Sequence, residues 1–162
     1  VAQAVETSTG LQPICKWPND LLLGSKKFCG ILSEGQFTGS DLTSVVIGIG
    51  INVNQVVFPE ELAHRATSLA LAGGGPVDRF VLFAEVMCRL EEEYDAVRKG
   101  RFGRVMAEWK VRTTLFGSEV AVDREGTLLR GTASHLAEDG GLVIAANGKE
   151  IKVLAGDVTV IT

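Results

Sequence analysis

The chain of 162 residues carries 16 basic and 20 acidic side chains, a formal net charge of −4, and 46% of its residues are hydrophobic. This composition is typical of a folded globular protein and excludes a disordered chain or a basic nucleic-acid-binding surface over the whole chain. No stretch of about 18 uncharged apolar residues occurs, so we predict no membrane span.

The first 54 residues predict the end of a helix and then a β-meander. The segment Val1–Leu11 predicts the tail of a helix. This helix should end at Gly10, where a left-handed residue would fit. Strands are expected at 12–17, 21–23, 28–37 and 42–53. Their short connections require antiparallel neighbours.

The last of these strands is almost continuously apolar between Val45 and Ile51. Such a run predicts a central strand that is covered on both faces. Gly48 and Gly50 stand two residues apart, so one face lacks side chains and another group should approach closely there.

Two helices are expected in the middle of the chain after a loop that contains a short helix near 59–71. Asp78 is a suitable N-cap for a helix that runs to Arg98. Three-four spacing predicts its buried face to be Phe83, Val86, Met87, Leu90, Tyr94 and Val97. The second helix is expected at 102–111.

From Leu115 onward the pattern changes to short alternating segments. Strands are expected at 119–122, 128–135, 142–145, 150–154 and 157–161. Asn147-Gly148 is a strong hairpin signal. Five short strands in so short a stretch predict a small closed β-barrel, SH3-like in size.

Cysteine and histidine spacing gives no sign of a disulfide framework or a metal site. Cys15, Cys29 and Cys88 are an odd and widely separated set, which predicts free thiols in a reducing compartment such as the cytoplasm. Neither His64 nor His135 stands in a ligand pattern, so we predict no metal-ligating residues.

Common nucleotide and catalytic motifs are missing. The segment Gly48–Val53 imitates a dinucleotide fingerprint, but Val53 replaces its third glycine and no helix follows. Gly30 and Gly35 have P-loop spacing, but Gln36-Phe37 stands where the motif requires lysine and a hydroxyl residue.

A cation, an indole, an amide and a carboxylate meet at the strand junction Lys16-Trp17-Pro18-Asn19-Asp20. Pro18 restricts Trp17 to an extended conformation, and Asn19-Asp20 is a turn pair. Taken one by one, these residues are explained as a solvated lysine, a core tryptophan and a turn.

Their order along the chain is more specific. Lys16–Asp20, then Gly30-Ile31-Leu32, then Gly48-Ile49-Gly50-Ile51-Asn52 together resemble the biotin protein ligase family. The resemblance implies an α+β fold. A partial class II synthetase-like (biotin/lipoate ligase-like) domain with a mixed or antiparallel sheet and flanking helices would span residues 1–114, and an SH3-like barrel residues 115–162.

The resemblance also implies a two-step reaction. Biotin and ATP, with Mg²⁺, give biotinyl-5′-AMP, and the biotinyl group then passes to a lysine of a biotin carboxyl carrier protein. In this reaction a carboxylate meets a polyphosphate, so a fixed cation must offset the repulsion of two anions. The resemblance gives this catalytic role to Lys16, which would contact both biotin and the nucleotide.

Further site residues follow from the same resemblance. Gly30, Ile31 and Leu32 would bind biotin, because a cyclic urea needs fixed backbone partners in an apolar slot. The residues expected on the nucleotide side are Trp17, Asn19, Asp20 and Asn52. Lys27 falls at a position that the family often fills with lysine, but a solvated role is equally open and it stays outside the predicted set.

The family's arginine- and glycine-rich loop is expected upstream of Val1, so we expect little ligase activity from this chain alone. Two other functions remain open: a lipoate ligase-like enzyme, and an inactive biotin-binding or protein-interaction module. A homodimer is open as well. Neither a membrane nor a nucleic acid is expected as a partner of this chain.

Overall fold

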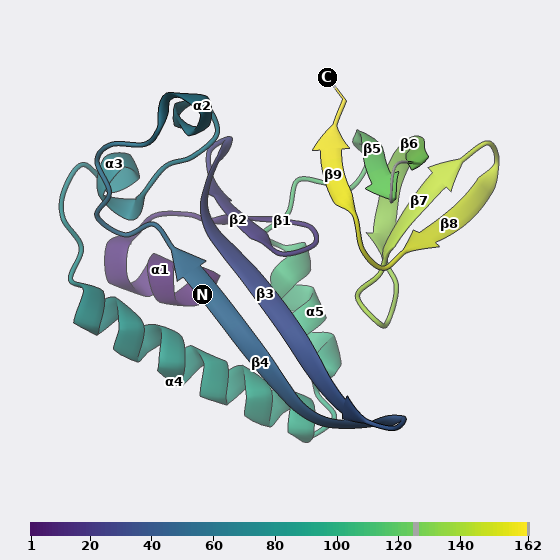
Figure 1. The fold of residues 1–162 in the computed structure, drawn as a ribbon, viewed down its shortest axis with the longest axis horizontal. Coiled ribbons are helices and arrows are strands. Elements are labelled where there is room, and N and C mark those ends of the chain that lie inside the picture. Colours follow the sequence, from purple (N-terminus) through teal and green to yellow (C-terminus); the bar gives the residue numbers. More distant parts are fainter. Residues whose placement is uncertain (125–126, 162) are drawn as a thin grey trace. The chain divides into compact units, whose positions relative to one another are not determined.

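The structure is a computed structural model that describes residues 1–124 and 127–161. The chain divides into two compact units (Figure 1). The first comprises Val1–Ile14 and Asn19–Leu90, and the second comprises Cys15–Pro18 and the residues from Glu91 onward. The sequence places a domain boundary at 114/115, where helices give way to short strands. The division into compact units rests on a different criterion, so this domain boundary stays a prediction.

The first unit begins as expected with a short helix, α1 (Ala2–Thr9). Gly10 ends it with a φ of 74° and donates its N–H to the carbonyl of Glu6. Strand β1 (Ile14–Lys16) follows, and the chain passes from the first unit to the second after Ile14.

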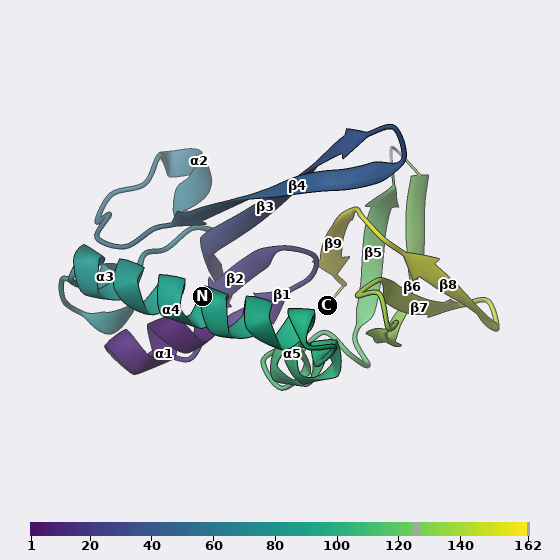
Figure 2. The ribbon, with the colours of Figure 1, turned by 90° about the horizontal axis from the view of Figure 1, so that it is seen from below.

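An antiparallel arrangement of β2 (Asp20–Leu23), β3 (Lys26–Thr38) and β4 (Asp41–Ile51) confirms the predicted meander. Gly30 lies opposite Asp20 on one side and Gly50 on the other. The chain turns at Gly24 and Gly39, whose φ values of 59° and 63° suit glycine. Helix α1 and the part of α4 (Arg79–Arg98) that belongs to this unit lie on the same side of the β3–β4 hairpin (Figure 2).

Strand β4 does not have the covered faces that its apolar run predicts. Val45, Val46 and Ile47 are 51%, 52% and 45% exposed. Within the described residues β4 pairs only with β3, so it is an edge strand and the prediction of a central strand was wrong. A run of apolar residues indicates that a strand needs covering, but it does not show which residues provide the cover.

Three helices follow the hairpin: α2 (Glu60–Ala63), α3 (Leu69–Gly73) and α4 (Arg79–Arg98). Asp78 caps α4 as predicted, because its Oδ1 accepts the N–H groups of Phe80 and Val81 at 2.8 and 3.2 Å. Ser68 caps α3 by accepting the N–H of Leu71.

The buried face of α4 differs from the predicted one. Leu82, Val86 and Ala96 are buried, and of these three Val86 was predicted. Of the predicted face, Phe83, Met87, Tyr94 and Val97 are exposed. Helix α4 carries apolar residues on more than one side. The three-four spacing therefore fits two different faces and does not show which of them is buried. Neither this helix nor any other in the described ranges is long and apolar enough to cross a membrane.

The second unit contains α5 (Phe102–Lys110) and an antiparallel sheet in the order β8-β7-β6-β5-β9. Its strands are β5 (Glu119–Arg124), β6 (Thr127–Leu136), β7 (Leu142–Ala146), β8 (Lys149–Val153) and β9 (Asp157–Val160). These confirm the predicted strands, and Asn147 and Gly148 make the expected turn with φ values of 51° and 72°. The mixed α+β class with two antiparallel sheets is therefore confirmed.

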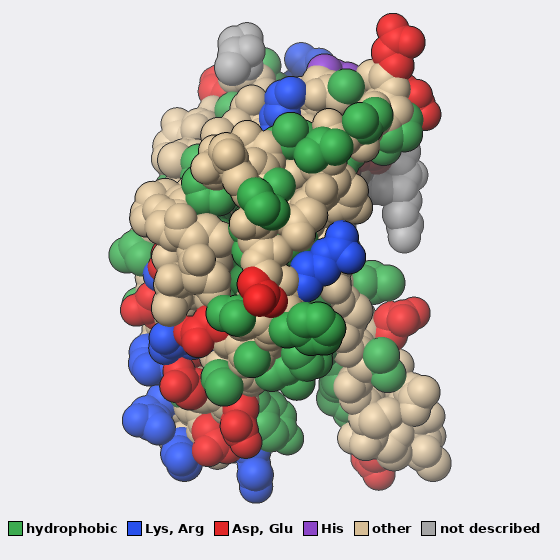
Figure 3. Space-filling model, turned by 90° about the vertical axis from the view of Figure 1, so that its left-hand side faces the viewer, with side chains coloured by type: hydrophobic (Ala, Val, Ile, Leu, Met, Phe, Trp, Pro, Cys, Tyr) green, Lys and Arg blue, Asp and Glu red, His purple; other side chains and the backbone are tan. Residues whose placement is uncertain are grey.

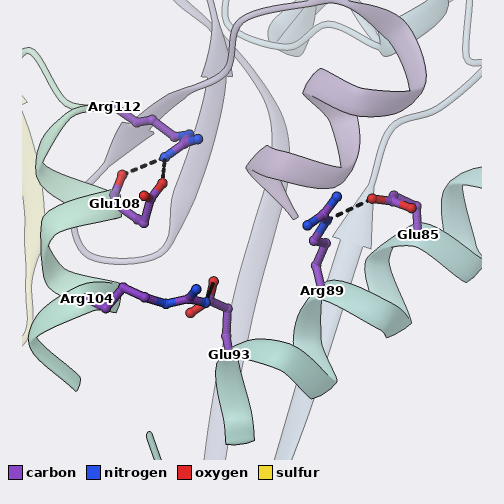
Figure 4. A network of polar contacts seen from close by, with 6 residues as sticks. All are labelled: Glu85, Arg89, Glu93, Arg104, Glu108 and Arg112. Carbon is purple, nitrogen blue, oxygen red and sulfur yellow. Dashed lines mark hydrogen bonds and ion pairs between the residues drawn. The ribbon is translucent and has the colours of Figure 1, made fainter. Parts of the chain in front are cut away.

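Ion pairs stabilise the two long helices (Figure 4). In the second unit, Arg104 of α5 contacts Glu93 of α4 at 2.7 Å. Arg112 contacts Glu108 one turn before it at 2.8 Å. In the first unit Arg89 contacts Glu85 at the same spacing and distance. Pairs one turn apart on a helix add only about 0.3–0.5 kcal/mol each, so they support the helices without determining the fold.

Candidate functional site

A shallow pocket of about 500 Å³ lies on the first unit where β3 and β4 pair. Its lining comprises Asn19, Lys27, Gly30, Ile31, Leu32, Gly48, Ile49 and Gly50. The pocket therefore brings together four residues that the sequence predicts as site residues: Asn19, Gly30, Ile31 and Leu32. It also includes the two glycines of β4 that predict a bare strand face.

The floor of the pocket is backbone. Gly30 pairs with Gly50 and Leu32 pairs with Gly48, so three glycines share one face of the hairpin. A Cβ added at Gly48 or Gly50 would meet only a carbonyl oxygen, at 3.8 Å. A flat ligand could therefore approach the peptide groups of both strands closely.

Lys27 and Asp20 form an ion pair at one edge of this glycine face, with Nζ and Oδ1 2.6 Å apart. The Asp20 side chain is only 18% exposed, whereas that of Lys27 is 48% exposed. Asp20 Oδ1 is buried and makes no hydrogen bond, so the ammonium group is what offsets the burial of this charge. The pair leaves the lysine accessible to a ligand in the pocket.

A bulge in the sheet explains why Lys27 reaches the pocket. The β2–β3 register pairs Leu21 with Cys29 but Leu22 with Lys27, so Phe28 is the extra residue. Side chains three positions apart on a regular strand point to opposite faces, but the bulge brings Lys27 and Gly30 to the same face. A Cβ at Gly30 would lie 3.1 Å from both Cε and Nζ of Lys27, so glycine makes room for the ammonium group.

The backbone of Lys27 is held on its other side by the loop that precedes α3. Its N–H donates to the carbonyl of Arg65 at 2.8 Å, and its carbonyl accepts the N–H of Thr67 at 2.9 Å. Sequence reasoning left Lys27 outside the site. The sequence does show a lysine three residues before Gly30. Regular strand alternation, however, would place the Lys27 side chain on the face opposite Gly30, and the sequence gives no sign of the bulge that corrects this.

Asn19 joins the junction to the pocket through its main chain. Its carbonyl accepts the N–H of Ile31 at 2.9 Å, which adds a hydrogen bond just before the first residue of β2. Asn19 is also part of the pocket lining.

Asn52 lies outside the pocket lining. Its Nδ2 donates to the carbonyl of Thr67 at 3.1 Å, and its backbone N–H donates to Phe28 at 2.7 Å. The side chain therefore ties the end of β4 to the loop before α3. A contact with a nucleotide stays a prediction.

Lys16 and Trp17 belong to the second unit. Lys16 Nζ lies 3.7 Å from Asp157 Oδ1, and the lysine side chain is 34% exposed. Trp17 is 4% exposed, and its Nε1 donates to the carbonyl of Gly140 at 3.0 Å. The predicted roles of both residues toward biotin or a nucleotide stay predictions.

Cys29, beside the glycine face, is not suited to act as a nucleophile. Burial raises the pKa of its thiol from 9.0 to about 11. At neutral pH almost no thiolate exists at this position, and the thiolate is the reactive form.

Comparisons with known proteins place these features in a family. Residues 4–52, which include the Lys16–Asp20 junction, β2, β3 and β4, match the biotin/lipoate A/B protein ligase family. The bifunctional ligase/repressor BirA of Bacillus subtilis is 33% identical over 160 residues, which cover 98% of this chain and 49% of that protein. The chain thus spans about half the length of the curated relatives it matches.

Solved structures extend the match over both units. A crystal structure of biotin protein ligase from Aquifex aeolicus is 30% identical, with a TM-score of 0.86 over 99% of this chain and 69% of that one. The structure of the Aquifex aeolicus enzyme in complex with biotin and ATP has a TM-score of 0.84 over 98% of this chain and 66% of that one, also at 30% identity. The chain belongs to the biotin protein ligase family.

Proposed function

We propose that the protein to which this chain belongs is a biotin protein ligase. It forms biotinyl-5′-AMP from biotin and ATP and transfers the biotinyl group to a lysine of a biotin carboxyl carrier protein. The observation that carries the proposal is the pocket of β3 and β4, in which a side-chain-free glycine face lies beside one ion-paired lysine. A neutral cyclic urea that pairs with backbone groups, joined to an apolar chain with an anionic end, matches both features.

Biotin binds along the hairpin in this proposal. The peptide groups around Gly30 and Gly50 face the ureido ring, because glycine leaves the backbone accessible there. Leu32, on the same face as Gly30, packs on the hydrocarbon part of the ligand. Ile31 points to the other face and contributes its backbone. Such pockets combine an apolar lining with a few fixed polar groups.

Lys27 is the cation that this pocket presents to the biotin carboxylate and the α-phosphate. As a compact point charge it reduces the repulsion between the two anions and stabilises the charge that develops on the phosphate. Asp20 orients Lys27, and Asn19 lies where it can contact the ligand. Lys16 is proposed as a second cation on the nucleotide side, with Trp17 and Asn52 as the further predicted nucleotide residues.

The residues present suit a Mg²⁺ ion that arrives with ATP. Across the described ranges no group of three His, Cys, Asp or Glu side chains gathers to hold a metal. Mg²⁺ is commonly held by one or two carboxylates together with substrate phosphates. Asp20 Oδ1 would lie 3.6 Å from a Cβ at Gly30, so this carboxylate is beside the glycine face. The ion would supply charge neutralisation on the phosphates.

The wider assignment follows from the same proposal. The second unit's sheet would be the SH3-like barrel, the carrier protein would supply the acceptor lysine, and the protein would act in the cytoplasm. A homodimer remains open.

Lys27→Met tests the proposal against a matched neighbour. Calorimetry would measure the affinity of the chain for a non-hydrolysable biotinyl-5′-AMP analogue, and pyrophosphate exchange would measure adenylation. A hydrogen bond to a charged group contributes about 1.5–3 kcal/mol, so Lys27→Met should weaken binding by roughly 10- to 100-fold. The control is Lys26→Met, because Lys26 Nζ donates instead to the carbonyl of Ala63 at 2.7 Å and should leave affinity unchanged.

The alternatives give different results. Equal or tighter binding of the lipoyl-5′-AMP analogue would favour a lipoate ligase-like enzyme. Binding of free biotin without any dependence on ATP would favour an interaction module. Equal losses in Lys26→Met and Lys27→Met would contradict the assigned role of Lys27.

A further inference from the structure

We infer that Trp17 is a positioning residue: it anchors the Lys16–Asp20 junction in the core of the second unit. It thereby fixes Asn19, which lines the pocket, and Asp20, which pairs with the pocket residue Lys27. The identity of the ligand in that pocket rests on the proposed function, but the positioning itself does not.

The path of the chain is the first step of the argument. Ile14 belongs to the first unit, Cys15–Pro18 to the second, and Asn19 again to the first. The polypeptide thus enters the second unit and leaves it within four residues. A segment this short has almost no slack, because each residue spans at most about 3.6 Å.

Three of these four residues have partners inside the second unit. The N–H of Cys15 donates to the carbonyl of Arg112 at 2.7 Å. Lys16 contacts Asp157 at 3.7 Å. The Trp17 indole is buried in a cluster with residues of the second sheet, among them Val122, Leu142 and Val158. Trp17 is the member of this segment that belongs to the core cluster, so the indole is the main anchor.

The partner of the indole N–H is itself held in place. Gly140 lies in the turn between β6 and β7, with a φ of 83°. Its N–H donates to Ala137 at 2.9 Å, and the N–H of Ala137 donates to Gly141 at 2.8 Å. Asp139 accepts the N–H of Gly141 and pairs with Lys152 at 2.6 Å. The carbonyl of Gly140 is therefore a fixed acceptor for Trp17.

On the other side of Pro18 the junction is bonded to the pocket. The carbonyl of Asn19 accepts the N–H of Ile31, and Asp20 pairs with Lys27. These groups are only two and three residues from Trp17. A displacement of the indole would be carried by the backbone to the Asn19 carbonyl and to the carboxylate that orients Lys27.

The test replaces the anchor conservatively. Trp17→Phe keeps an aromatic ring but loses the N–H that binds Gly140. The matched control is Trp109→Phe, because Trp109 packs against the same cluster from α5 and lies outside the junction. Amide hydrogen exchange at Ile31 reports the bond to Asn19, and the Asn52 amide, bonded to Phe28, is an internal reference in the same unit.

Trp17→Phe should speed exchange at Ile31 by roughly 10-fold, the equivalent of one hydrogen bond, while Asn52 stays unchanged. It should also weaken binding of the biotinyl-5′-AMP analogue. Trp109→Phe should change neither. If Trp17→Phe does not fold, Lys152→Met loosens the turn around Gly140 without altering the core and should shift Ile31 in the same direction by a smaller factor.

The outcomes separate this inference from the proposed function. The exchange measurement needs no ligand, so faster exchange at Ile31 alone supports positioning even where the biotin analogue does not bind. Unchanged exchange at Ile31 in both Trp17→Phe and Lys152→Met would overturn the inference. An equal effect of Trp109→Phe would overturn it as well, because it would show general loosening of the second unit.

Discussion

The two units bury their apolar residues to different extents. In the second unit the sheet residues Val120, Val122, Leu142 and Ile144 are fully buried in one core cluster. In the first unit the β3–β4 hairpin exposes a row of large apolar side chains: Leu32, Phe37, Leu42, Val45, Val46 and Ile47. Hydrophobic side chains also gather on the surface around α3 and α4 (Figure 3). The second unit owes its stability to packing, whereas the hairpin of the first unit presents surface that can serve binding.

The strongest test of this contrast is to shorten one isoleucine in each sheet. Ile144→Ala removes a fully buried side chain and should lower the free energy of unfolding by about 3 kcal/mol, because it leaves a cavity. Ile47→Ala, at a side chain 45% exposed, should change it by less than about 0.5 kcal/mol. Urea unfolding would measure both.

The spectroscopic signal can be assigned to a unit. Trp17 and Trp109 both lie in the second unit, so tryptophan fluorescence follows that unit, and circular dichroism follows the whole chain. A loss for Ile47→Ala as large as that for Ile144→Ala would mean that the hairpin is covered in solution.

Glycine substitutions sharpen the same comparison. A Cβ at Gly131 in β6 would lie 2.5 Å from the carbonyl oxygen of Ala145 and 2.7 Å from Ile144, whereas a Cβ at Gly48 would meet only a carbonyl at 3.8 Å. Gly131→Ala should therefore lower the melting temperature through an overpacking loss of about 1–3 kcal/mol. Gly48→Ala should leave the melting temperature nearly unchanged but weaken ligand binding, because its methyl group occupies the bare face. Normal ligand affinity in Gly48→Ala would count against this face as the binding surface.

The first unit also has buried polar groups that stabilise it. Ser68 is fully buried; its hydroxyl donates to the carbonyl of Gln55 at 2.6 Å and accepts the N–H of Leu71 at 3.1 Å. Ser68→Ala loses a helix cap and leaves the Gln55 carbonyl without this donor, so unfolding should become easier by about 1–2 kcal/mol. Ser40→Ala, at an exposed turn, is the control and should have little effect. Chemical denaturation followed by circular dichroism compares the two, and equal losses would contradict the role of the cap.

Much of the fold could be predicted because the signals are local. Gly10, Asp78 and Asn147-Gly148 each specify a helix end or a turn through backbone geometry, and the structure has all three. The buried face of α4 could not be predicted, since it depends on which apolar stripe meets the rest of the fold.

The same distinction applies to the site. Gly48 and Gly50 predicted a bare face, because glycine's lack of a side chain is a property of the sequence itself. Lys27 was missed because its direction depends on a bulge at Phe28. The packing of Trp17 depends on residues more than 100 positions away, such as Gly140, and spacing along the junction gives no sign of such a partner.

The smallest expected effect concerns the turn that receives the Trp17 indole. The hydrogen bond from Lys152 and then the N–H of Gly141 lower the pKa of Asp139 below its ordinary 3.8. The carboxylate therefore adds stability above pH 3.8, and this contribution is lost as the pH falls through the lower pKa of the folded chain. The gain is small because the Lys152 and Asp139 side chains are 48% and 50% exposed, and water screens the pair.

Lys152→Met should raise the pKa of Asp139 toward its ordinary value, because it removes the largest cause of the shift, while the N–H of Gly141 keeps part of it. The carboxyl carbon shift of Asp139, followed by NMR through the acidic range, measures this directly. Lys149→Met on the same strand is the control and should leave the titration unchanged. If the pKa of Asp139 is the same with and without Lys152, the ion pair does not form in solution. The turn that holds Gly140 would then depend on its backbone hydrogen bonds alone.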